Sequence, residues 1–247
     1  DNGELTQQTE LPLAVTWQQL NLNSTLADDT LQSNLTLALT DETRLDATAN
    51  ISQLQSDNRL LEGNIKLTRF ALSLLQPLLG EFSELQGELS SELDLAGSLH
   101  QPLLNGQIDI SNIRVKGKQA PVDIDDADIK LSLSGQQASL QGLVTTTRGE
   151  IKLSGDASWQ QLSDWQAQVN ITGDELRLQV PQARLLVAPD LVLKATPALT
   201  RLSGTVTIPQ ANINIDSLPQ NAIELSNDLI LLDEKLQPIP QQEKAVF

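Results

Sequence analysis

The chain has 247 residues, a net charge of −16, no cysteine and only 2% aromatic residues. This charge argues against nucleic-acid binding and against electrostatic docking on anionic lipid surfaces, because no Lys/Arg excess is present to neutralise phosphates. The absence of cysteine excludes disulfides and thiol chemistry. The chain has neither a signal peptide nor a run of 18 apolar residues, and it starts at Asp1. We therefore expect it to be a segment of a longer protein.

Alternating apolar and polar residues predict β-strands along most of the chain. The alternation is clearest in residues 85–95, where leucines face one way and Gln86, Glu88 and Glu92 face the other. It also occurs in residues 11–17, 31–39, 104–110, 129–133, 165–171 and 202–208. This pattern is typical of an antiparallel sheet with one apolar face and one polar face.

Within these strands, an aliphatic residue, a variable residue and a glycine recur. Examples are Leu61-Glu62-Gly63, Leu104-Asn105-Gly106 and Leu202-Ser203-Gly204. The glycine usually falls on the apolar face, where it favours a bend or a close approach of two backbones. Repeated bends would curve the sheet toward its apolar side. An ordinary curved sandwich of two sheets is the alternative.

One segment breaks the alternation. Apolar residues at positions 71, 72, 74, 75, 78 and 79 have helical spacing, Pro77 shortens the helix and Gly80 ends it. We expect a short amphipathic helix near residues 69–80, on the apolar face of the sheet. It would either cap a hydrophobic core or act as a plug in an apolar groove.

The predicted fold is therefore all-β: an elongated, curved antiparallel sheet that forms an open hydrophobic groove. We expect residues 1–247 to form one continuous segment of this groove. Its parts are N-terminal strands in 1–68, a helical insertion in 69–81, C-terminal strands in 82–236 and a flexible Pro- and Gln-rich loop in 237–247.

The sequence offers little for catalysis, and we expect a non-enzymatic protein without cofactor. His100 is the only histidine and lies beside Pro102 on a predicted turn. The acidic residues 123–128 lack the glycine and distal glutamate of a calcium loop, so a solvated turn or a weak cation site are the two interpretations. We predict no catalytic or metal-binding residues.

The continuous aliphatic face is then the candidate working surface. The helix residues expected in the groove are Phe70, Leu72, Leu74, Leu75, Leu78 and Leu79. The strand residues expected to line the groove are Leu35, Leu37, Leu39, Ile65, Leu67, Leu89, Leu93, Leu95, Leu104, Ile108, Ile110, Ile129, Leu131, Leu133, Val169, Ile171, Val206 and Ile208.

One stretch carries a recognisable motif of the form G-x-L-x-x-P-x-L-x-G-x-I-x-I. The matching positions are Gly97, Leu99, Pro102, Leu104, Gly106, Ile108 and Ile110. This stretch resembles the repeat of the TamB family, in the AsmA-like group of the Gram-negative envelope. The helix near residues 70–79 also resembles the C-terminal region of that family.

The resemblance implies a taco-like β-groove in the periplasm, in a parent chain anchored in the inner membrane. It implies an outer-membrane barrel partner of the TamA type, movement of phospholipid between the two membranes, and support of outer-membrane protein assembly. Phospholipid acyl chains would then occupy the groove.

Two other functions remain open. A scaffold could pair its strand edges with outer-membrane protein substrates or partner domains without carrying lipid. A secreted adhesin or β-solenoid is the third possibility, although solenoids have shorter and stricter repeats.

Overall fold

The structure is a computed structural model that describes residues 3–7, 13–79, 84–117, 122–180 and 183–213. The chain divides into two compact units, Asp1–Asn212 and Ile213–Phe247, and the description below concerns the first unit. The predicted loop 237–247 and the last part of the predicted C-terminal strands, residues 214–236, lie outside the described residues.

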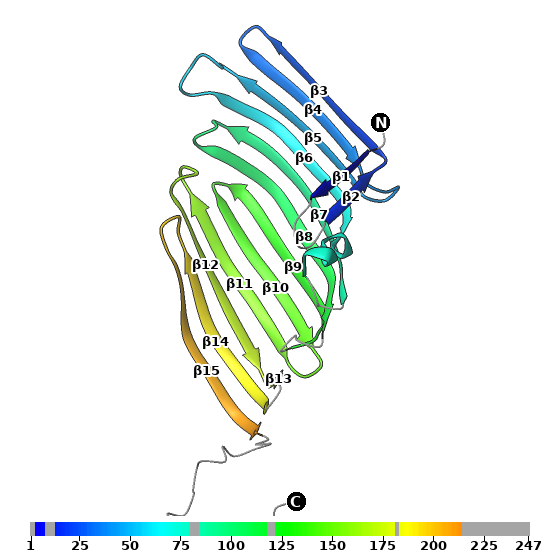
Figure 1. Cartoon of the computed structure of the whole chain (residues 1–247). Coiled ribbons are helices and arrows are strands. Elements are labelled where there is room, and N and C mark those ends of the chain that lie inside the picture. The colour runs from blue at the N-terminus through cyan, green and yellow to red at the C-terminus, as the bar shows by residue number, and fades with distance from the viewer. Residues whose placement is uncertain (1–2, 8–12, 80–83, 118–121, 181–182, 214–247) are drawn as a thin grey trace, which may run out of the picture. The chain divides into compact units, whose positions relative to one another are not determined.

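The described chain consists of strands and one 3₁₀ helix (Figure 1). The elements are β1 (Gly3–Gln7), β2 (Leu13–Trp17), β3 (Gln19–Ala27), β4 (Thr30–Ala38), β5 (Arg44–Ser52), β6 (Leu60–Ala71), η1 (Leu72–Leu79), β7 (Glu84–Gly97), β8 (Pro102–Lys116), β9 (Ile124–Gly135), β10 (Gln137–Thr146), β11 (Glu150–Trp159), β12 (Trp165–Asp174), β13 (Leu176–Val180), β14 (Ala183–Ala195) and β15 (Thr200–Ile213).

Strands β3 to β15 form one 13-stranded sheet, and β1 pairs with β2 in a separate two-stranded sheet. Almost every strand lies beside its neighbours in sequence, so the strands follow one another across the sheet in chain order (Figure 1). The pairing is antiparallel throughout the registers that the structure gives. The prediction of an open antiparallel sheet is confirmed, and no second large sheet covers it within the described residues.

Each strand end lies at one of two rims of the sheet. We call the rim that holds η1 and the β10–β11 turn the η1 rim, and the rim that holds the β9–β10 and β11–β12 connections the opposite rim. The β3–β4 turn, at the opposite rim, has left-handed backbone at Asp28 and Asp29, as a two-residue hairpin turn requires.

Irregularities interrupt the sheet near the η1 rim. The register shifts in β6 between Leu67 and Phe70, where Arg69 has a φ of 47°. Glu175, with a φ of 48°, separates β12 from β13, and both of these strands pair with β14. These bulges bend single strands without exchanging the apolar and polar faces of the sheet.

The predicted helix is present but differs from the expectation. It is a 3₁₀ helix from Leu72 to Leu79, whereas residues 69–71 belong to β6. The reason is that β6 continues to pair after its bulge, with Phe70 opposite Leu89 and Ala71 opposite Glu88. Pro77 lacks an amide hydrogen, which favours a short helical segment over a longer α-helix. No described helix is long and apolar enough to cross a membrane.

The recurrent glycines lie where neighbouring backbones approach closely. A Cβ atom at Gly106 would collide with the carbonyl oxygen of Glu92, and one at Gly204 with that of Asp190. Both glycines have φ near 130°, a region that other residues rarely adopt. Added Cβ atoms at Gly63 and Gly155 would meet neighbouring carbonyls in the same way. The close approach predicted from the repeated phrase is therefore confirmed.

Candidate functional site

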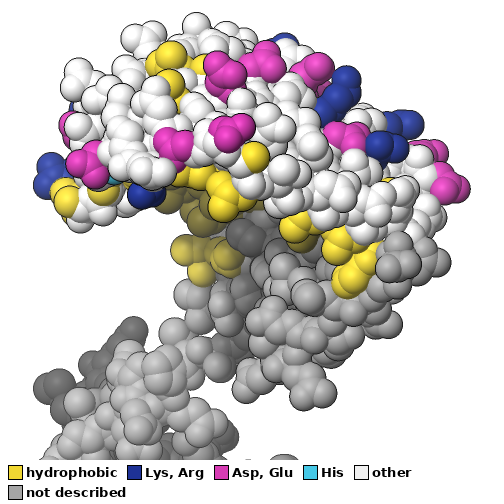
Figure 2. Space-filling model, turned by 90° about the horizontal axis from the view of Figure 1, so that it is seen from above, with side chains coloured by type: hydrophobic (Ala, Val, Ile, Leu, Met, Phe, Trp, Pro, Cys, Tyr) yellow, Lys and Arg dark blue, Asp and Glu magenta, His cyan; other side chains and the backbone are white. Residues whose placement is uncertain are grey.

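The candidate site is the apolar face of the 13-stranded sheet. Figure 2 shows hydrophobic side chains along the hollowed side of the described sheet, and acidic and basic side chains on its outer side. The strand registers give the same division, because residues paired across two strands lie on the same face.

One row of paired residues crosses the sheet from β3 to β14 without a polar side chain. Its members are Leu22, Leu35, Ala47, Ile65, Leu93, Gly106, Leu133, Ala138, Ala157, Ala167 and Ala195. Neighbouring strands are about 4.8 Å apart, so ten steps span roughly 48 Å. The row runs perpendicular to the strands, which is the direction of the groove.

A second row, closer to the η1 rim, is equally apolar. It consists of Phe70, Leu89, Ile110, Ile129, Gly142, Leu153, Ile171 and Leu191. The two rows contain many of the predicted lining residues, and the others share their face by register. Leu37 pairs with Leu45, Leu95 with Leu104, and Ile108 with Leu131.

The remaining predictions also fall on this face, with one residue outside the strands. Leu67 pairs with Leu45, and Val169 with Leu193. Val206 and Ile208 alternate along β15 from Gly204, where an added Cβ would meet the backbone of Leu191 in β14. Leu39 follows the end of β4, where its amide donates to the Thr43 carbonyl at 3.0 Å.

Most of the apolar face is only partly buried. In the described part no side chain is fully buried, and Leu22 and Leu26 of β3 are 65% and 70% exposed. The exceptions are Ala138 of the first row and a small group that we call the buried cluster, which consists of Ala127, Val144, Leu176 and Val187. Val144 pairs with Ala127, and Leu176 with Val187, on the apolar face near the η1 rim.

The 3₁₀ helix lies on the apolar face, where the sequence places it. A Cβ atom at Gly87 would be only 2.9 Å from Cδ1 of Leu72, so this leucine covers β7 at that position. Phe70 faces the groove from β6, opposite Leu89, and Leu74 is partly exposed. The side chains of Leu78 and Leu79 lie outside the described part. This placement agrees with both predicted roles, a cap and a plug.

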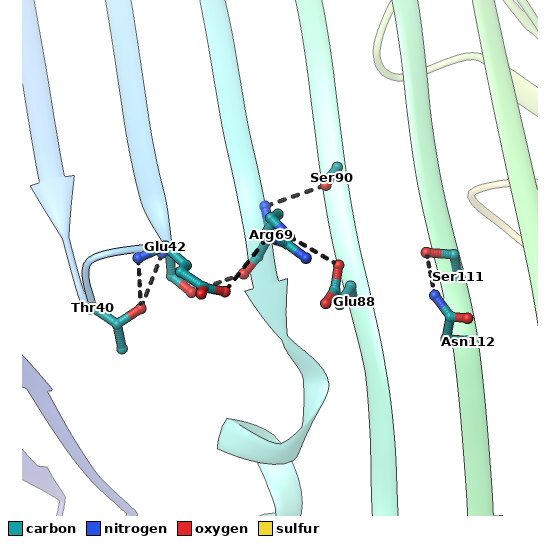
Figure 3. A network of polar contacts seen from close by, with 8 residues as sticks. Thr40, Glu42, Arg69, Glu88, Ser90, Ser111 and Asn112 are labelled. Atoms are coloured by element: carbon teal, nitrogen blue, oxygen red, sulfur yellow. Dashed lines mark hydrogen bonds and ion pairs between the residues drawn. The ribbon is translucent and has the colours of Figure 1, made fainter.

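Arg69, in β6 just before the helix, contacts both β7 and the β4–β5 turn (Figure 3). Its amide donates to Ser90 Oγ at 3.2 Å, and its carbonyl accepts from Thr43 Oγ1 at 2.8 Å. Its guanidinium lies 3.3 Å from Glu88 Oε2 and 3.5 Å from Glu42 Oε2. These contacts fix the bulge on the polar face and thereby the point at which the chain passes to η1.

The polar face carries exposed ion pairs. Arg44 Nε lies 2.6 Å from Asp46 Oδ2, and Thr36 Oγ1 donates to Asp46 Oδ1 at 3.0 Å. The Arg44 guanidinium therefore holds the pKa of Asp46 below its ordinary value, and burial only partly opposes this shift. The same contacts raise the pKa of Arg44. Such pairs contribute solubility and strand pairing more than chemistry.

No catalytic or metal geometry appears among the described residues. They contain no group of three His, Cys, Asp or Glu side chains that could hold a metal ion. His100 lies in the exposed β7–β8 turn. Asp128, from the acidic stretch, accepts a hydrogen bond from the Asn112 amide at 3.2 Å.

The sequence interpretation missed two features of the face. Leu20, Leu22 and Leu26 continue it onto β3, and their spacing of two and four residues was a sufficient signal. Trp159 lies opposite Trp165 at the opposite rim, and its Nε1 donates to the Pro102 carbonyl at 2.9 Å. That bond spans β9 and β10, and no local pattern could have indicated it.

Comparison with known proteins matches the chain to two family models and to curated relatives. The model described as TamB, N-terminal domain, matches residues 1–110, and the TamB C-terminal domain matches residues 137–246. The translocation and assembly module subunit TamB of Haemophilus influenzae is 34% identical over 216 residues. These residues are 87% of this chain and 17% of that relative. No solved structure matches the chain.

Proposed function

Because the chain belongs to the TamB family, we propose that its apolar face is a segment of a conduit for phospholipid. The lipid would move across the periplasm between the inner and outer membranes, with its acyl chains on the sheet. We further propose that the chain acts within a translocation and assembly module, beside an outer-membrane barrel partner of the TamA type, in a parent protein anchored in the inner membrane.

The observation that carries this proposal is the uninterrupted apolar row from Leu22 to Ala195. The two tails of a phospholipid contain roughly 30 methylenes, and exposing each to water costs about 0.8 kcal/mol. Unaided passage through water therefore faces a barrier of roughly 20 kcal/mol or more. A surface that covers the tails at each step removes most of this barrier.

The composition of the surface favours movement over storage. Leucine, isoleucine, alanine and glycine give the row no side-chain hydrogen-bonding group that would select one lipid. Closely spaced apolar positions about 4.8 Å apart offer neighbouring sites of similar affinity. A lipid can then move from strand to strand without crossing a polar position.

The experiment compares Leu93→Asp, on the apolar face, with Gln107→Asp, on the polar face of the adjacent strand. Phospholipid that co-purifies with the chain is measured by mass spectrometry, transfer between vesicles by fluorescence, and folding by circular dichroism. We expect Leu93→Asp to lower bound lipid and transfer several-fold in a folded protein, because a carboxylate in the row must be desolvated by passing tails. Gln107→Asp should leave both unchanged.

Unchanged transfer in both Leu93→Asp and Ile108→Asp would contradict the conduit. A scaffold that pairs strand edges is the competing function, and the exposed edge strand β3 is the feature that favours it. Reproducible absence of lipid from the purified wild-type chain, together with binding to barrel substrates that a proline in β3 abolishes, would support the scaffold instead.

A further inference from the structure

A hollow of about 450 Å³ near the η1 rim is lined by hydrogen-bond donors. Its polar lining residues are Arg148, Arg177, Gln179, Arg184, Gln210 and Asn212. Arg177 pairs with Leu186, and Gln179 with Arg184, which places these residues on one face of β13 and β14. Leu176 and Val187 of the buried cluster alternate with them and occupy the other face. Arg177, Gln179 and Arg184 are therefore on the polar side of the sheet, and Leu185, which also lines the hollow, is on the apolar side.

No carboxylate of the described residues lines this hollow, although acidic residues outnumber basic residues 32 to 16 in the chain. Two other hollows of the sheet differ in this respect, since Asp109 and Asp128 line one and Asp156 lines the other. A concentration of guanidinium and amide donors without carboxylates is a composition that suits an oxyanion.

The charges around the hollow are only partly compensated. Arg148 forms an exposed ion pair with Glu175 at 3.3 Å. Among the described residues, Arg177 and Arg184 form no ion pair within 4.0 Å. Glu150 and Asp174 face each other on the same side of β11 and β12, but neither contributes to the lining. With respect to the residues that the structure describes, two guanidinium groups thus remain available to a ligand.

We propose that this hollow binds an oxyanion of the phosphate class. Guanidinium groups bind phosphate through pairs of charge-assisted hydrogen bonds, and the amides of Gln179, Gln210 and Asn212 supply further donors. Resting on the proposed function, the anion is the phosphate of a phospholipid headgroup whose tails lie on the apolar face.

The position of the hollow suits this assignment. Arg184 is the second residue of β14 and Gln179 the last but one of β13, so both lie about one residue, or ~3.3 Å, from the end of their strands. On the opposite face of the same strands, Leu178 pairs with Leu185 and Val180 is 40% exposed. A headgroup held at the rim can therefore belong to a lipid whose tails contact these apolar residues.

The test compares the wild-type chain with the double variant Arg177→Gln/Arg184→Gln. The control, Lys152→Gln/Lys194→Gln, removes the same charge from the polar face outside the hollow. Binding of inorganic phosphate is measured by NMR titration, and binding of phosphatidylglycerol and of diacylglycerol, which lacks phosphate, by lipid extraction. We expect the arginine variant to weaken phosphate and phosphatidylglycerol binding at least about tenfold, with diacylglycerol binding unchanged and the control like wild type.

Each alternative result has a separate meaning. Equal phosphate binding in wild type and arginine variant, or none in either, would overturn the anion site. Loss of phosphate binding with unchanged phosphatidylglycerol binding would support a site for free phosphate and overturn the headgroup assignment. Failure of the wild-type chain to bind diacylglycerol would count against the conduit, whereas phosphate binding would still support the hollow.

Discussion

The apolar face differs between its first strands and its later ones. Strands β3 to β5 contain no buried apolar side chain, and Leu22 and Leu26 are mostly exposed. Strands β9 to β14 contain the buried cluster, in which Leu176 and Val187 are only 3% and 4% exposed. Both regions show the same alternation in sequence, so the pattern alone does not tell a structural apolar position from an open one.

The two regions are also held together differently. In β3 to β5, side-chain hydrogen bonds join the strands on both faces. Ser24 Oγ lies 3.0 Å from Ser33 Oγ on the apolar face, and Thr36 is bonded to Asp46 on the polar face. In the later strands, apolar contacts near the η1 rim add a small core. We infer that the first strands keep their apolar surface available because their pairing does not depend on burying it.

The largest expected effect is a difference between these two regions in how much a leucine-to-alanine substitution lowers the free energy of unfolding. Leu176→Ala should destabilise the chain by about 2–4 kcal/mol, because it leaves a cavity in the buried cluster. Leu22→Ala, the matched change in the open region, should cost less than about 0.5 kcal/mol. The free energy of unfolding is measured by urea denaturation after removal of co-purified lipid, since a ligand of the folded state would add stability.

The amount of bound lipid gives a second comparison of the two regions. Leu22→Ala should reduce lipid content more than its stability effect implies, because Leu22 begins the apolar row. Equal destabilisation by the two substitutions would show that the open region is covered in solution, and the distinction between the two regions would fail.

Much of the fold could be predicted from local patterns in the sequence. Alternation predicted the strands and their two faces, and it placed Leu93, Ile108 and Ile129 on one of them. It succeeded because period-2 burial is a property of a strand and its two faces. The repeated glycine phrase predicted close backbone approach, which Gly106 and Gly204 show.

Other features depend on contacts between distant segments. The donors around the hollow that Arg148, Arg177 and Arg184 line come from the β10–β11 turn and from β13, β14 and β15. No single stretch of sequence therefore contains them. The helix began later than predicted because Phe70 and Ala71 pair with β7, a contact that helical spacing cannot reveal. Burial of Leu176 likewise depends on Val187, which lies across a strand pair.

A smaller effect on stability is expected in β8, which lies between the two regions in the sheet. Gly106→Ala should destabilise the chain by about 1–3 kcal/mol, because the new Cβ meets the Glu92 carbonyl and φ is +132°. Gly142→Ala is the matched control on the same face, where the new Cβ meets only side chains, at 3.3 Å. Similar urea midpoints for the two variants would show that the close approach at Gly106 contributes little to the curved sheet.

The smallest effect concerns the polar contacts that join β4 to β5. The pKa of Asp46 is lower in the folded chain than in the unfolded chain, chiefly because of Arg44. A carboxylate of this kind stabilises the fold above its unfolded pKa of about 3.9, and its contribution disappears as the pH falls through the folded value. Wild type should therefore be slightly more stable than Asp46→Asn at neutral pH, and the difference in urea midpoint should shrink as the pH falls below about 3.9 and vanish below the folded pKa. A difference that persists at low pH would mean that the charge of Asp46 is not what stabilises the fold, since the Oδ1 atom of asparagine can still accept the hydrogen bond from Thr36. Because both partners are exposed, either result leaves the apolar face of these strands unchanged.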